Sequence, residues 1–317
     1  MPADILLLMV NLPPAFRERL SARFEILGPF PRHPSEALSP EQAGRVTAVV
    51  TFGSQVSDAT LFDALPNLKL LCCWGTGFER VDLAAAKARG ITATHNPGAN
   101  ATAVADHAMA LMLASIRRVV PTDRYIRTGQ WQGNAVTRLP VVRGLTGRRV
   151  GIYGLGAIGE KVAKRAAAFE MEIGYCNRRK RDDVAYAYFP TLLELATWAD
   201  VLVVGPRADA VTHHSVNATI FRALGPDGHV INIARGSIID EAALIEALQN
   251  NVIAGAGLDV FEHEPQVPEA LRQLENAVLT PHTGAGTQEA REAMLEMTVA
   301  NIEGFFDTGK ALAPIPE

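Results

Sequence analysis

Cysteine and long apolar runs are scarce in this sequence, and each scarcity excludes a class of protein. The 317 residues include three cysteines, Cys72, Cys73 and Cys176. They cannot form the disulfide framework of a secreted scaffold, and two of them are adjacent. Neither a Cys-X-X-Cys spacing nor a His-rich ligand spacing occurs, so we expect no zinc site and no other metal. No apolar run reaches the length of a membrane-spanning helix, so we expect no membrane partner.

Net charge and the N-terminal residues exclude two further classes. A net charge of −4 argues against bulk affinity for nucleic acid. The apolar run Ile5–Val10 is short, has no basic lead and is followed by Pro13-Pro14, so it indicates a first strand rather than a signal peptide. Apolar residues make up 48% of a chain that is long enough for two domains. We therefore expect a soluble cytoplasmic protein with substantial cores.

Short apolar strands alternate with helical stretches, a pattern typical of parallel sheets covered by helices on both faces. In the first part of the chain we expect strands at Ile5–Val10, Phe24–Leu27, Val46–Thr51, Leu68–Cys73 and Ile91–Thr94. In the second part we expect strands at Val150–Tyr153, Glu172–Cys176, Val201–Val204, His229–Ile233 and Gly255–Asp259.

The pattern breaks at His95–Asn100, which precedes a long Ala-rich helix expected over Thr102–Arg118. We place the first crossing between domains there. A second helix, expected over Gln288–Phe306, is long enough to return to the first domain. The predicted division assigns residues 1–98 and 287–317 to a substrate-binding domain and residues 99–286 to a nucleotide-binding domain.

Sequence alone does not identify partners for the residues around the long helix. His107 on the helix and His95 before it have no obvious partner, so we interpret His107 as a packing residue and His95 as a loop residue. Helical character is expected to continue from Arg124 to Trp131. The tryptophan is expected to be exposed, where it could serve a subunit contact.

A dinucleotide-binding motif follows the first strand of the second domain. That strand leads into Gly154-Leu155-Gly156-Ala157-Ile158-Gly159, and a helical pattern and a second strand come next. The first glycine permits a tight turn, the second lets the backbone approach a pyrophosphate, and the third lets the helix pack on the strand. The helix N-terminus offers free N–H groups to the phosphates. The strand–turn–helix context predicts a dinucleotide site.

The residues after the second strand indicate which dinucleotide binds. Sites for NAD usually place Asp or Glu about 20 residues after the first glycine, where it holds the ribose hydroxyls. Here Asn177-Arg178-Arg179 begins a basic run, and no acid occurs before Asp182. Guanidinium groups can bind a 2′-phosphate bidentately, whereas a carboxylate would repel it. We therefore predict NADP(H) in preference to NAD(H), with a solvated basic loop as the alternative.

Three residues near strand ends could carry chemistry on a keto acid. Arg235 follows an apolar strand, where it can fork onto an α-keto carboxylate and the neighbouring carbonyl oxygen. A carboxylate such as Glu264, bonded to one nitrogen of His282, would orient the imidazole and raise its pKa. The imidazole could then give a proton to the carbonyl oxygen as hydride arrives at carbon. Glu262 and His263 could also form the pair, so sequence spacing leaves the assignment open.

A glycine-rich turn, Trp74-Gly75-Thr76-Gly77-Phe78, directly follows the fourth expected strand. Such a turn at the carboxyl end of a strand can present consecutive N–H groups to an anion. A plain tight turn is the alternative. The turn is therefore a candidate site for the carboxylate of a substrate.

Four collinear segments together resemble the D-isomer-specific 2-hydroxyacid dehydrogenases. They are Gly-Leu-Gly-Ala-Ile-Gly at 154–159, Asn-Ile-Ala-Arg-Gly-Ser at 232–237, Gly-Leu-Asp-Val-Phe-Glu-His-Glu-Pro at 257–265 and Thr-Pro-His at 280–282. Asn-Arg-Arg after the second strand and the absence of an appended regulatory domain resemble the glyoxylate/hydroxypyruvate and hydroxyphenylpyruvate reductase branch. Thr283-Gly284-Ala285-Gly286 departs from the family, which more often carries Gly-Ser-Ala after the histidine, so cofactor contacts there stay open.

The resemblance implies a fold, a site and an assembly. The fold is α/β, with two doubly wound parallel-sheet domains in which a Rossmann domain is inserted into a flavodoxin-like substrate domain. Arg235 binds substrate, Glu264 pairs with the histidine, and His282 is the proton donor. Asp259 lies near the nicotinamide end of the cofactor. The resemblance also implies a homodimer built around the nucleotide domains and closure of the two domains over the ligand.

The ligand contacts that we expect form two sets. The substrate contacts are Trp74, Gly75, Thr76, Gly77 and Arg235. The cofactor contacts are Gly154, Leu155, Gly156, Ala157, Ile158, Gly159, Asn177, Arg178, Arg179, Pro206, Ile233, Ala234, Arg235, Asp259, His282 and Gly284.

The leading hypothesis is NADPH-dependent reduction of a small 2-keto acid, such as glyoxylate or hydroxypyruvate, to the D-2-hydroxy acid. Two alternatives are also enzymatic. They are reduction of bulkier aryl-pyruvates and oxidation in the biosynthetic direction, as in phosphoglycerate dehydrogenases. A third alternative is a nucleotide-gated corepressor, because fold alone does not determine function.

Overall fold

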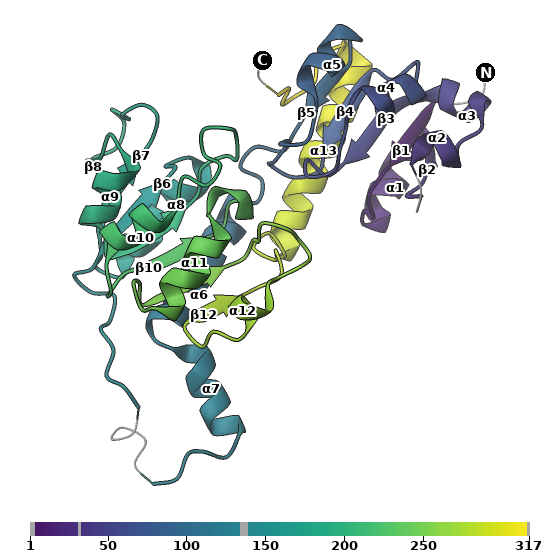
Figure 1. The fold of residues 1–317 in the computed structure, drawn as a ribbon. Helices are drawn as coiled ribbons and strands as arrows, with labels where there is room; N and C mark the ends of the chain where they lie inside the picture. Colours follow the sequence, from purple (N-terminus) through teal and green to yellow (C-terminus); the bar gives the residue numbers. More distant parts are fainter. Residues whose placement is uncertain (1–3, 31–32, 134–138, 316–317) are drawn as a thin grey trace. The chain divides into compact units, whose positions relative to one another are not determined.

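The computed structural model describes residues 4–30, 33–133 and 139–315, and its internal contacts divide the chain into two units (Figure 1). The discontinuous unit comprises Met1–Asn100 and Thr287–Glu317, and the inserted unit comprises Ala101–Gly286. The first boundary lies two residues beyond residue 98, because the turn before it belongs to the discontinuous unit. Asn96 donates its amide to the oxygen of Gly75, and the Thr76 hydroxyl lies 3.0 Å from Asn100 Oδ1.

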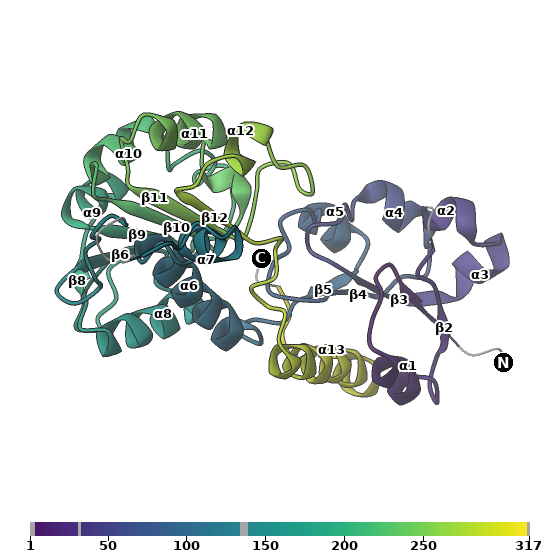
Figure 2. The ribbon, with the colours of Figure 1, turned by 90° about the horizontal axis from the view of Figure 1, so that it is seen from below.

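The discontinuous unit contains a five-stranded parallel sheet in the order β2-β1-β3-β4-β5. Its strands are β1 (Ile5–Leu8), β2 (Glu25–Leu27), β3 (Val46–Thr51), β4 (Leu70–Cys73) and β5 (Thr92–Thr94). Its helices are α1 (Pro14–Leu20), α2 (Pro34–Ala37), α3 (Pro40–Arg45), α4 (Ala59–Ala64), α5 (Leu83–Ala88) and α13 (Gln288–Thr308). Figure 2 shows α1 and α13 on one face of this sheet and α4 and α5 on the other. The strand order is that of a flavodoxin-like doubly wound sheet.

The inserted unit contains a seven-stranded parallel sheet in the order β12-β11-β10-β9-β6-β7-β8. Its strands are β6 (Arg149–Tyr153), β7 (Glu172–Cys176), β8 (Ala187–Tyr188), β9 (Val201–Val204), β10 (His229–Asn232), β11 (Gly255–Leu258) and β12 (Ala277–Leu279). Its helices are α6 (Ala101–Ile116), α7 (Val119–Arg127), α8 (Ala157–Ala168), α9 (Leu192–Trp198), α10 (Ala218–Leu224), η2 (Gly236–Ile238), α11 (Glu241–Gln249) and α12 (Glu269–Arg272). In Figure 2, α6 and α8 cover one face, and α10 and α11 cover the other.

Alternation along the strands explains why both sheets have two cores. Val201 and Val203 of β9 pack into the core beneath α6 and α8, whereas Leu202 and Val204 pack into the core beneath α9 and α10. Successive side chains of a strand point to opposite faces, so a fully apolar strand requires helices on both sides. None of the helices in the described ranges is long and apolar enough to cross a bilayer.

The predicted α/β fold with two parallel sheets is confirmed, and all ten predicted strands are present. The two-residue strand β8 of the inserted unit was not predicted, because so short a run carries little periodicity. The helix expected from Arg124 to Trp131 is wrong in its bounds, because α7 ends at Arg127. Gly129 there has a positive φ of 72°, a conformation that terminates a helix.

The strand order of the inserted unit identifies a candidate ligand site. It reverses at β6, so the loops after β6 and β9 leave the sheet in opposite directions. Open α/β sheets bind ligands in the crevice outside such a switch point, at the carboxyl ends of the strands. A Cβ on Gly154, after β6, would lie 2.5 Å from the nitrogen of Pro206, after β9. Glycine therefore allows the two loops to approach at the switch point.

Candidate active site

Three neighbouring strands of the inserted unit lead to the residues predicted to carry chemistry. Arg235 follows β10, Glu264 lies in the loop after β11, and His282 lies in the turn after β12. These strands are adjacent in the sheet and parallel. Parallel strands end at the same edge, so the topology collects residues that are distant in sequence.

The imidazole of His282 pairs with the carboxylate of Glu264. His282 Nδ1 lies 2.8 Å from Glu264 Oε2, and the other carboxylate oxygen accepts a hydrogen bond from the amide of Phe261 at 3.1 Å. Burial raises the pKa of Glu264, but the hydrogen bond and charge of His282 outweigh it, so this pKa lies below its ordinary value. Within the described residues, His282 Nε2 makes no hydrogen bond, and the side chain is 45% exposed. This nitrogen is available to a substrate.

The alternative pair that sequence spacing left open is not formed. Glu262 Oε1 lies 2.6 Å from the Nε2 of His214, which belongs to the loop after β9. His263 is exposed, and its carbonyl oxygen accepts a hydrogen bond from the amide of Gln266.

Arg235 is held in place by the turn that follows β10. The side chain of the buried Asn232 accepts from the amide of Ala234 and donates to the oxygen of Arg235, both at 3.1 Å. A Cβ on Gly236 would lie 1.9 Å from the carbonyl carbon of Phe261, so only glycine permits this approach of the two loops. The approach brings the guanidinium of Arg235 close enough to contribute to the lowered pKa of Glu264.

Asp259 organises the turn that carries His282. Asp259 is 3% exposed. Its carboxylate accepts hydrogen bonds from Thr280 Oγ1 at 2.7 Å and from the amides of Thr283 and Gly284 at 2.8 Å. Its carbonyl oxygen accepts from the amide of His282 at 2.8 Å. Burial raises the pKa of Asp259, but these bonds and that from His107 outweigh it and keep this pKa below its ordinary value.

His107 has partners that the sequence did not reveal. Its Nε2 lies 2.8 Å from Thr280 Oγ1 and 3.2 Å from Asp259 Oδ1. These contacts form because α6 packs against β11 and β12 beside this turn, so His107 is a packing residue whose imidazole is hydrogen-bonded. His95 is a loop residue with a partner as well, since its Nδ1 lies 2.9 Å from the oxygen of Thr76 in the discontinuous unit. No short-range pattern connects these residues, which are 173 and 19 positions from their partners.

The glycine-rich turn after β6 has the form that phosphate binding requires. Gly154 has a positive φ of 93°, and a Cβ on Gly159 would lie 2.6 Å from the oxygen of Gly154. A Cβ on Gly156 would meet nothing within 4 Å, so the backbone there is open to a ligand. No side chain caps the N-terminus of α8, and its first N–H groups are therefore available to phosphate oxygens. The side chain of Leu155 is buried, while Ala157 and Ile158 start the helix.

The loop after β7 divides its basic residues between two roles. Arg181 forms ion pairs with Glu160 and Asp183, and the side chain of Asn177 bonds the amide of Leu155 at 2.6 Å. Arg178 and Arg179 are exposed, and neither makes an ion pair or hydrogen bond within the described residues. Two uncommitted guanidinium groups beside the glycine-rich turn, with no acid at the end of β7, fit a dinucleotide that carries a 2′-phosphate.

The remaining residues expected to contact the cofactor lie at the same edge. Pro206 follows β9, Ile233 and Ala234 follow β10, and Gly284 lies in the turn after β12. Ile233 and Ala234 are buried at 7% and 8% exposure. A Cβ on Gly284 would lie 2.9 Å from Asp259 Oδ2, so this glycine permits its amide to reach that carboxylate.

The glycine-rich turn of the discontinuous unit presents backbone rather than side chains. Gly75 has a positive φ of 114°, and a Cβ there would meet nothing within 4 Å. The hydroxyl of Thr76 bonds Asn96 O and Asn100 Oδ1, so it is engaged within the unit. The ring of Trp74 is 9% exposed and packs edge-on against Phe16. Trp74, although expected among the substrate contacts, therefore has its ring in the core of this unit.

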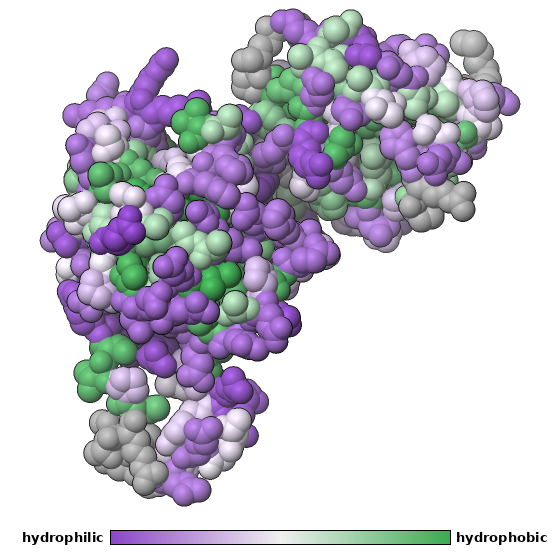
Figure 3. Space-filling model, viewed as in Figure 1, coloured by the Kyte–Doolittle hydropathy of each residue, from purple (hydrophilic) through white to green (hydrophobic). Residues whose placement is uncertain are grey.

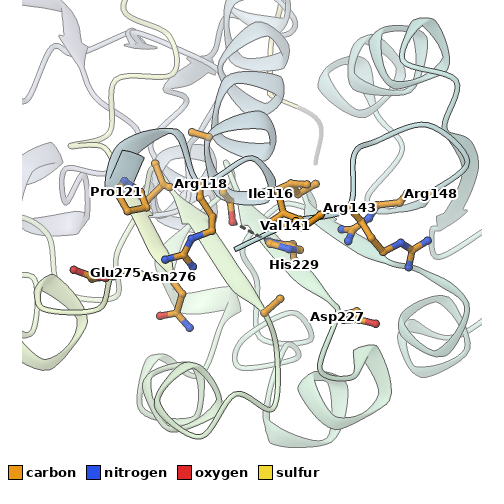
Figure 4. A pocket seen from close by; sticks show the side chains of 15 residues that line it. Ile116, Arg118, Pro121, Val141, Arg143, Arg148, Asp227, His229, Glu275 and Asn276 are labelled. Carbon is orange, nitrogen blue, oxygen red and sulfur yellow. Dashed lines mark hydrogen bonds between the residues drawn. The ribbon is translucent and has the colours of Figure 1, made fainter. Parts of the chain in front are cut away.

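A cavity of about 230 Å³ lies at the opposite edge of the seven-stranded sheet (Figure 4). Its lining includes Arg148 before β6, His229 at the start of β10 and Asn276 before β12, so it is remote from the carboxyl ends of the strands. Ser115 Oγ lies 2.9 Å from His229 Nδ1. Arg148 is 4% exposed, and among the described residues its Nε and Nη1 have no hydrogen-bond partner.

The chain is similar to known proteins over nearly its whole length. A family model described as "D-isomer specific 2-hydroxyacid dehydrogenase, NAD binding domain" matches residues 109–284. Glyoxylate/hydroxypyruvate reductase A of Arabidopsis thaliana is 40% identical over 309 residues, 98% of each chain. Hydroxyphenylpyruvate reductase of Plectranthus scutellarioides is 38% identical over 315 residues, 99% of this chain and 100% of that protein.

A solved structure is similar as well. It is the NADPH-dependent glyoxylate/hydroxypyruvate reductase of Sinorhizobium meliloti in complex with NADP and malonate. It is 38% identical to this chain with a TM-score of 0.89, and the match covers 98% of this chain and 96% of that one.

Proposed function

Because the chain belongs to the D-isomer specific 2-hydroxyacid dehydrogenase family, we propose that it reduces glyoxylate and hydroxypyruvate to 2-hydroxy acids with NADPH. The family predicted from sequence is thereby confirmed. The observation that carries the proposal is the His282–Glu264 pair of 2.8 Å, which leaves the second imidazole nitrogen open, while the charge of Arg235 acts on the same Glu264. A bound nicotinamide supplies the hydride.

Each proposed role follows from the geometry of one residue. Glu264 fixes the ring of His282 and stabilises its protonated form, so that Nε2 can donate a proton to the ketone oxygen. Arg235 binds the substrate carboxylate and the ketone oxygen through its planar fork of N–H groups. In the discontinuous unit, the open backbone at Gly75 and the adjoining amides of Thr76 and Gly77 form a separate candidate site for a carboxylate.

The cofactor site is proposed to prefer NADP(H) over NAD(H). The free N–H groups at the start of α8 and the open backbone of Gly156 would hold the pyrophosphate. Arg178 and Arg179 would hold the 2′-phosphate. The NADP complex of the Sinorhizobium meliloti reductase supports this preference.

A panel of keto acids tests the reaction. The purified protein is assayed with glyoxylate, hydroxypyruvate and 4-hydroxyphenylpyruvate, each with NADPH and with NADH.

We expect Arg235→Ala to lower kcat/KM by about 10³-fold or more with NADPH binding retained, because it removes a charge-assisted bidentate contact to the reacting group. Arg272→Ala, which removes an exposed arginine on α12, is the matched control. Loss of NADPH binding in Arg235→Ala, or full turnover, would contradict the assigned role.

A second candidate substrate class is aryl-pyruvates. It is favoured by the 38% identity to the hydroxyphenylpyruvate reductase, which spans 99% of this chain. The panel distinguishes the two classes. A kcat/KM for 4-hydroxyphenylpyruvate more than tenfold above that for hydroxypyruvate would assign the chain to the aryl class.

The protein is further proposed to be a homodimer that associates through the inserted unit. An arm formed by residues 119–133 and 139–148 exposes apolar side chains, and some of them appear as green atoms in the lower part of Figure 3. The exposed fractions are 50% for Val119, 56% for Ile126, 57% for Trp131 and 96% for Val141. A second copy would cover this apolar surface and the adjacent Arg148. Sedimentation equilibrium should give twice the chain mass, and Val141→Asp should shift it toward the monomer.

A further inference from the structure

Two histidines and a glutamate outside the proposed active site lie together at the carboxyl edge of the inserted unit. His213 and His214 belong to the loop after β9, and Glu262 belongs to the loop after β11. One ligand atom from each of the three lies within 4.8 Å of the others. We propose that His213, His214 and Glu262 form a binding site for one divalent transition-metal ion of the zinc class.

The ligand chemistry fits such an ion. Neutral imidazole nitrogen and carboxylate oxygen are preferred ligands of Zn²⁺, and two histidines with one carboxylate leave a fourth position to water. Glu262 is half-buried and supplies the negative charge, while His213 is exposed and gives the ion access from solvent. Hard cations such as Mg²⁺ prefer oxygen ligands, so the site is expected to discriminate against them.

Only small movements convert the present geometry into a coordination shell. Ligand bonds of roughly 2.0–2.2 Å in a tetrahedron require ligand atoms about 3.4 Å apart. His214 Nε2 and Glu262 Oε1 are 2.6 Å apart, so that contact must open by less than about 1 Å. The rings of His213 and His214 are stacked with centroids 4.0 Å apart, and they must splay so that both planes meet the ion. The exposed ring of His213 is free to turn in this way.

The backbone around the site already holds two of the ligands in place. The amide of His214 donates to the oxygen of Ser237 at 2.9 Å, and the amide of Glu262 donates to Glu241 Oε2 at 3.3 Å. Asp209 Oδ1 accepts from the amide of Thr212 at 2.9 Å, which closes the loop just before the histidines. Hydrogen bonds that already orient the ligands lower the free energy needed to order them when the ion binds.

The sequence predicted no zinc site because its ligands are separated. His214 and Glu262 are 48 positions apart, and no standard ligand spacing connects them. Only the adjacent His213-His214 pair was available as a signal. Glu262 lies two positions before Glu264, so an ion at this site would link the loop after β9 to the loop that supports His282.

Metal titration of the full chain tests the proposal. After treatment with a chelator and gel filtration, the protein is titrated with Zn²⁺ by calorimetry, and with Co²⁺ by visible absorption, without substrate or cofactor. We expect one ion per chain. His213→Ala and Glu262→Gln should each weaken binding at least tenfold, because each removes one of three protein ligands. His263→Ala removes an exposed neighbouring histidine and should leave the affinity unchanged.

Two variants distinguish loss of the metal site from loss of the fold and from binding at His282. His213→Ala leaves the His214–Glu262 hydrogen bond in place, so its circular dichroism and melting temperature should match those of the unchanged protein. His282→Ala tests whether the ion prefers the other imidazole–carboxylate pair. Absence of stoichiometric binding would overturn the proposal. So would binding that His282→Ala abolishes and His213→Ala leaves intact.

Discussion

Single residues at the end of β7 carry the proposed preference for NADPH over NADH. Arg178 and Arg179 are exposed and uncommitted within the described residues, whereas Arg181 in the same loop is paired with Glu160 and Asp183. A basic run in sequence therefore contains one structural arginine and two that are available to a ligand. Arg178 and Arg179 are therefore the two arginines that we propose bind a 2′-phosphate.

Replacing both available arginines should change the preference for NADPH. We expect Arg178→Ala with Arg179→Ala to raise KM for NADPH about 10²-fold, because charge-assisted hydrogen bonds contribute roughly 1.5–3 kcal/mol each. KM for NADH should change by less than about threefold on the same reasoning. Arg222→Ala with Arg272→Ala removes the same charge from exposed positions on α10 and α12 and is the control. Equal effects on both cofactors would mean that the loop does not recognise the 2′-phosphate.

Glu264 provides a second test at the scale of one residue. Its carboxylate is ionised at neutral pH, because the hydrogen bond and charge of His282 outweigh burial and lower the pKa of Glu264. A neutral amide in Glu264→Gln keeps a hydrogen bond but no longer stabilises the protonated imidazole. We expect kcat/KM for keto-acid reduction to fall about 10²–10⁴-fold. Steady-state kinetics measure this effect, and an unchanged kcat/KM would contradict the pairing role.

At the scale of elements, the turn after β12 depends on a buried carboxylate from the neighbouring strand. Asp259 accepts hydrogen bonds from Thr280, Thr283 and Gly284, and α6 adds His107 to the same group. The turn therefore keeps its shape through contacts among α6, β11 and β12. His282 is positioned by this arrangement as much as by its own pairing with Glu264.

Removing the hydroxyl of Thr280 should loosen this turn. Thr280→Val leaves Asp259 and His107 each without one hydrogen bond, which should lower the free energy of unfolding by about 1–3 kcal/mol. We also expect a lower kcat for keto-acid reduction with little change in KM for NADPH. Thr283→Val makes the same substitution at an exposed side chain and is the control. Chemical denaturation and steady-state kinetics measure the two effects, and equal losses in both variants would contradict the argument.

At the scale of the whole molecule, His229 makes stability depend on pH. It is 7% exposed, and burial, with a contribution from the nearby Arg148, lowers the pKa of His229 from 6.5 to about 4. The side chain therefore stays neutral in the folded protein over a pH range in which the unfolded chain binds a proton. Stability should fall as the pH drops from about 6.5 to about 4, with no further contribution below that.

The size of this effect follows from the difference between the two pKa values. A difference of 6.5 to about 4 corresponds to roughly 2–4 kcal/mol. His229→Gln should reduce the loss of unfolding free energy between pH 6.5 and 4 by that amount. His263→Gln, at an exposed position, should leave the pH dependence as it is. Urea denaturation at several pH values measures the free energy of unfolding. If this free energy depends on pH in the same way in His229→Gln and in the unchanged protein, the role assigned to burial of His229 is contradicted.

The sequence by itself determined most of the secondary structure and the sheet edge at which we expect a ligand. Apolar strands of four to six residues alternating with helices permit little except parallel sheets with two covered faces, and the spacing of Gly154, Gly156 and Gly159 marks the start of the second sheet. These signals are local, because the periodicity of side chains and the conformational demands of glycine act over a few residues. The family resemblance then added candidate roles for Arg235, Glu264 and His282.

Only the tertiary structure decided which side chains are partners. Glu262, His263 and Glu264 are consecutive in sequence. In the fold, Glu262 pairs with His214 and Glu264 pairs with His282. Hydrogen bonds act over about 3 Å and depend on direction, so a turn of the backbone reassigns them without any change of sequence. For the same reason His107, which lies 173 positions from Thr280, could be identified as its partner only in the folded chain.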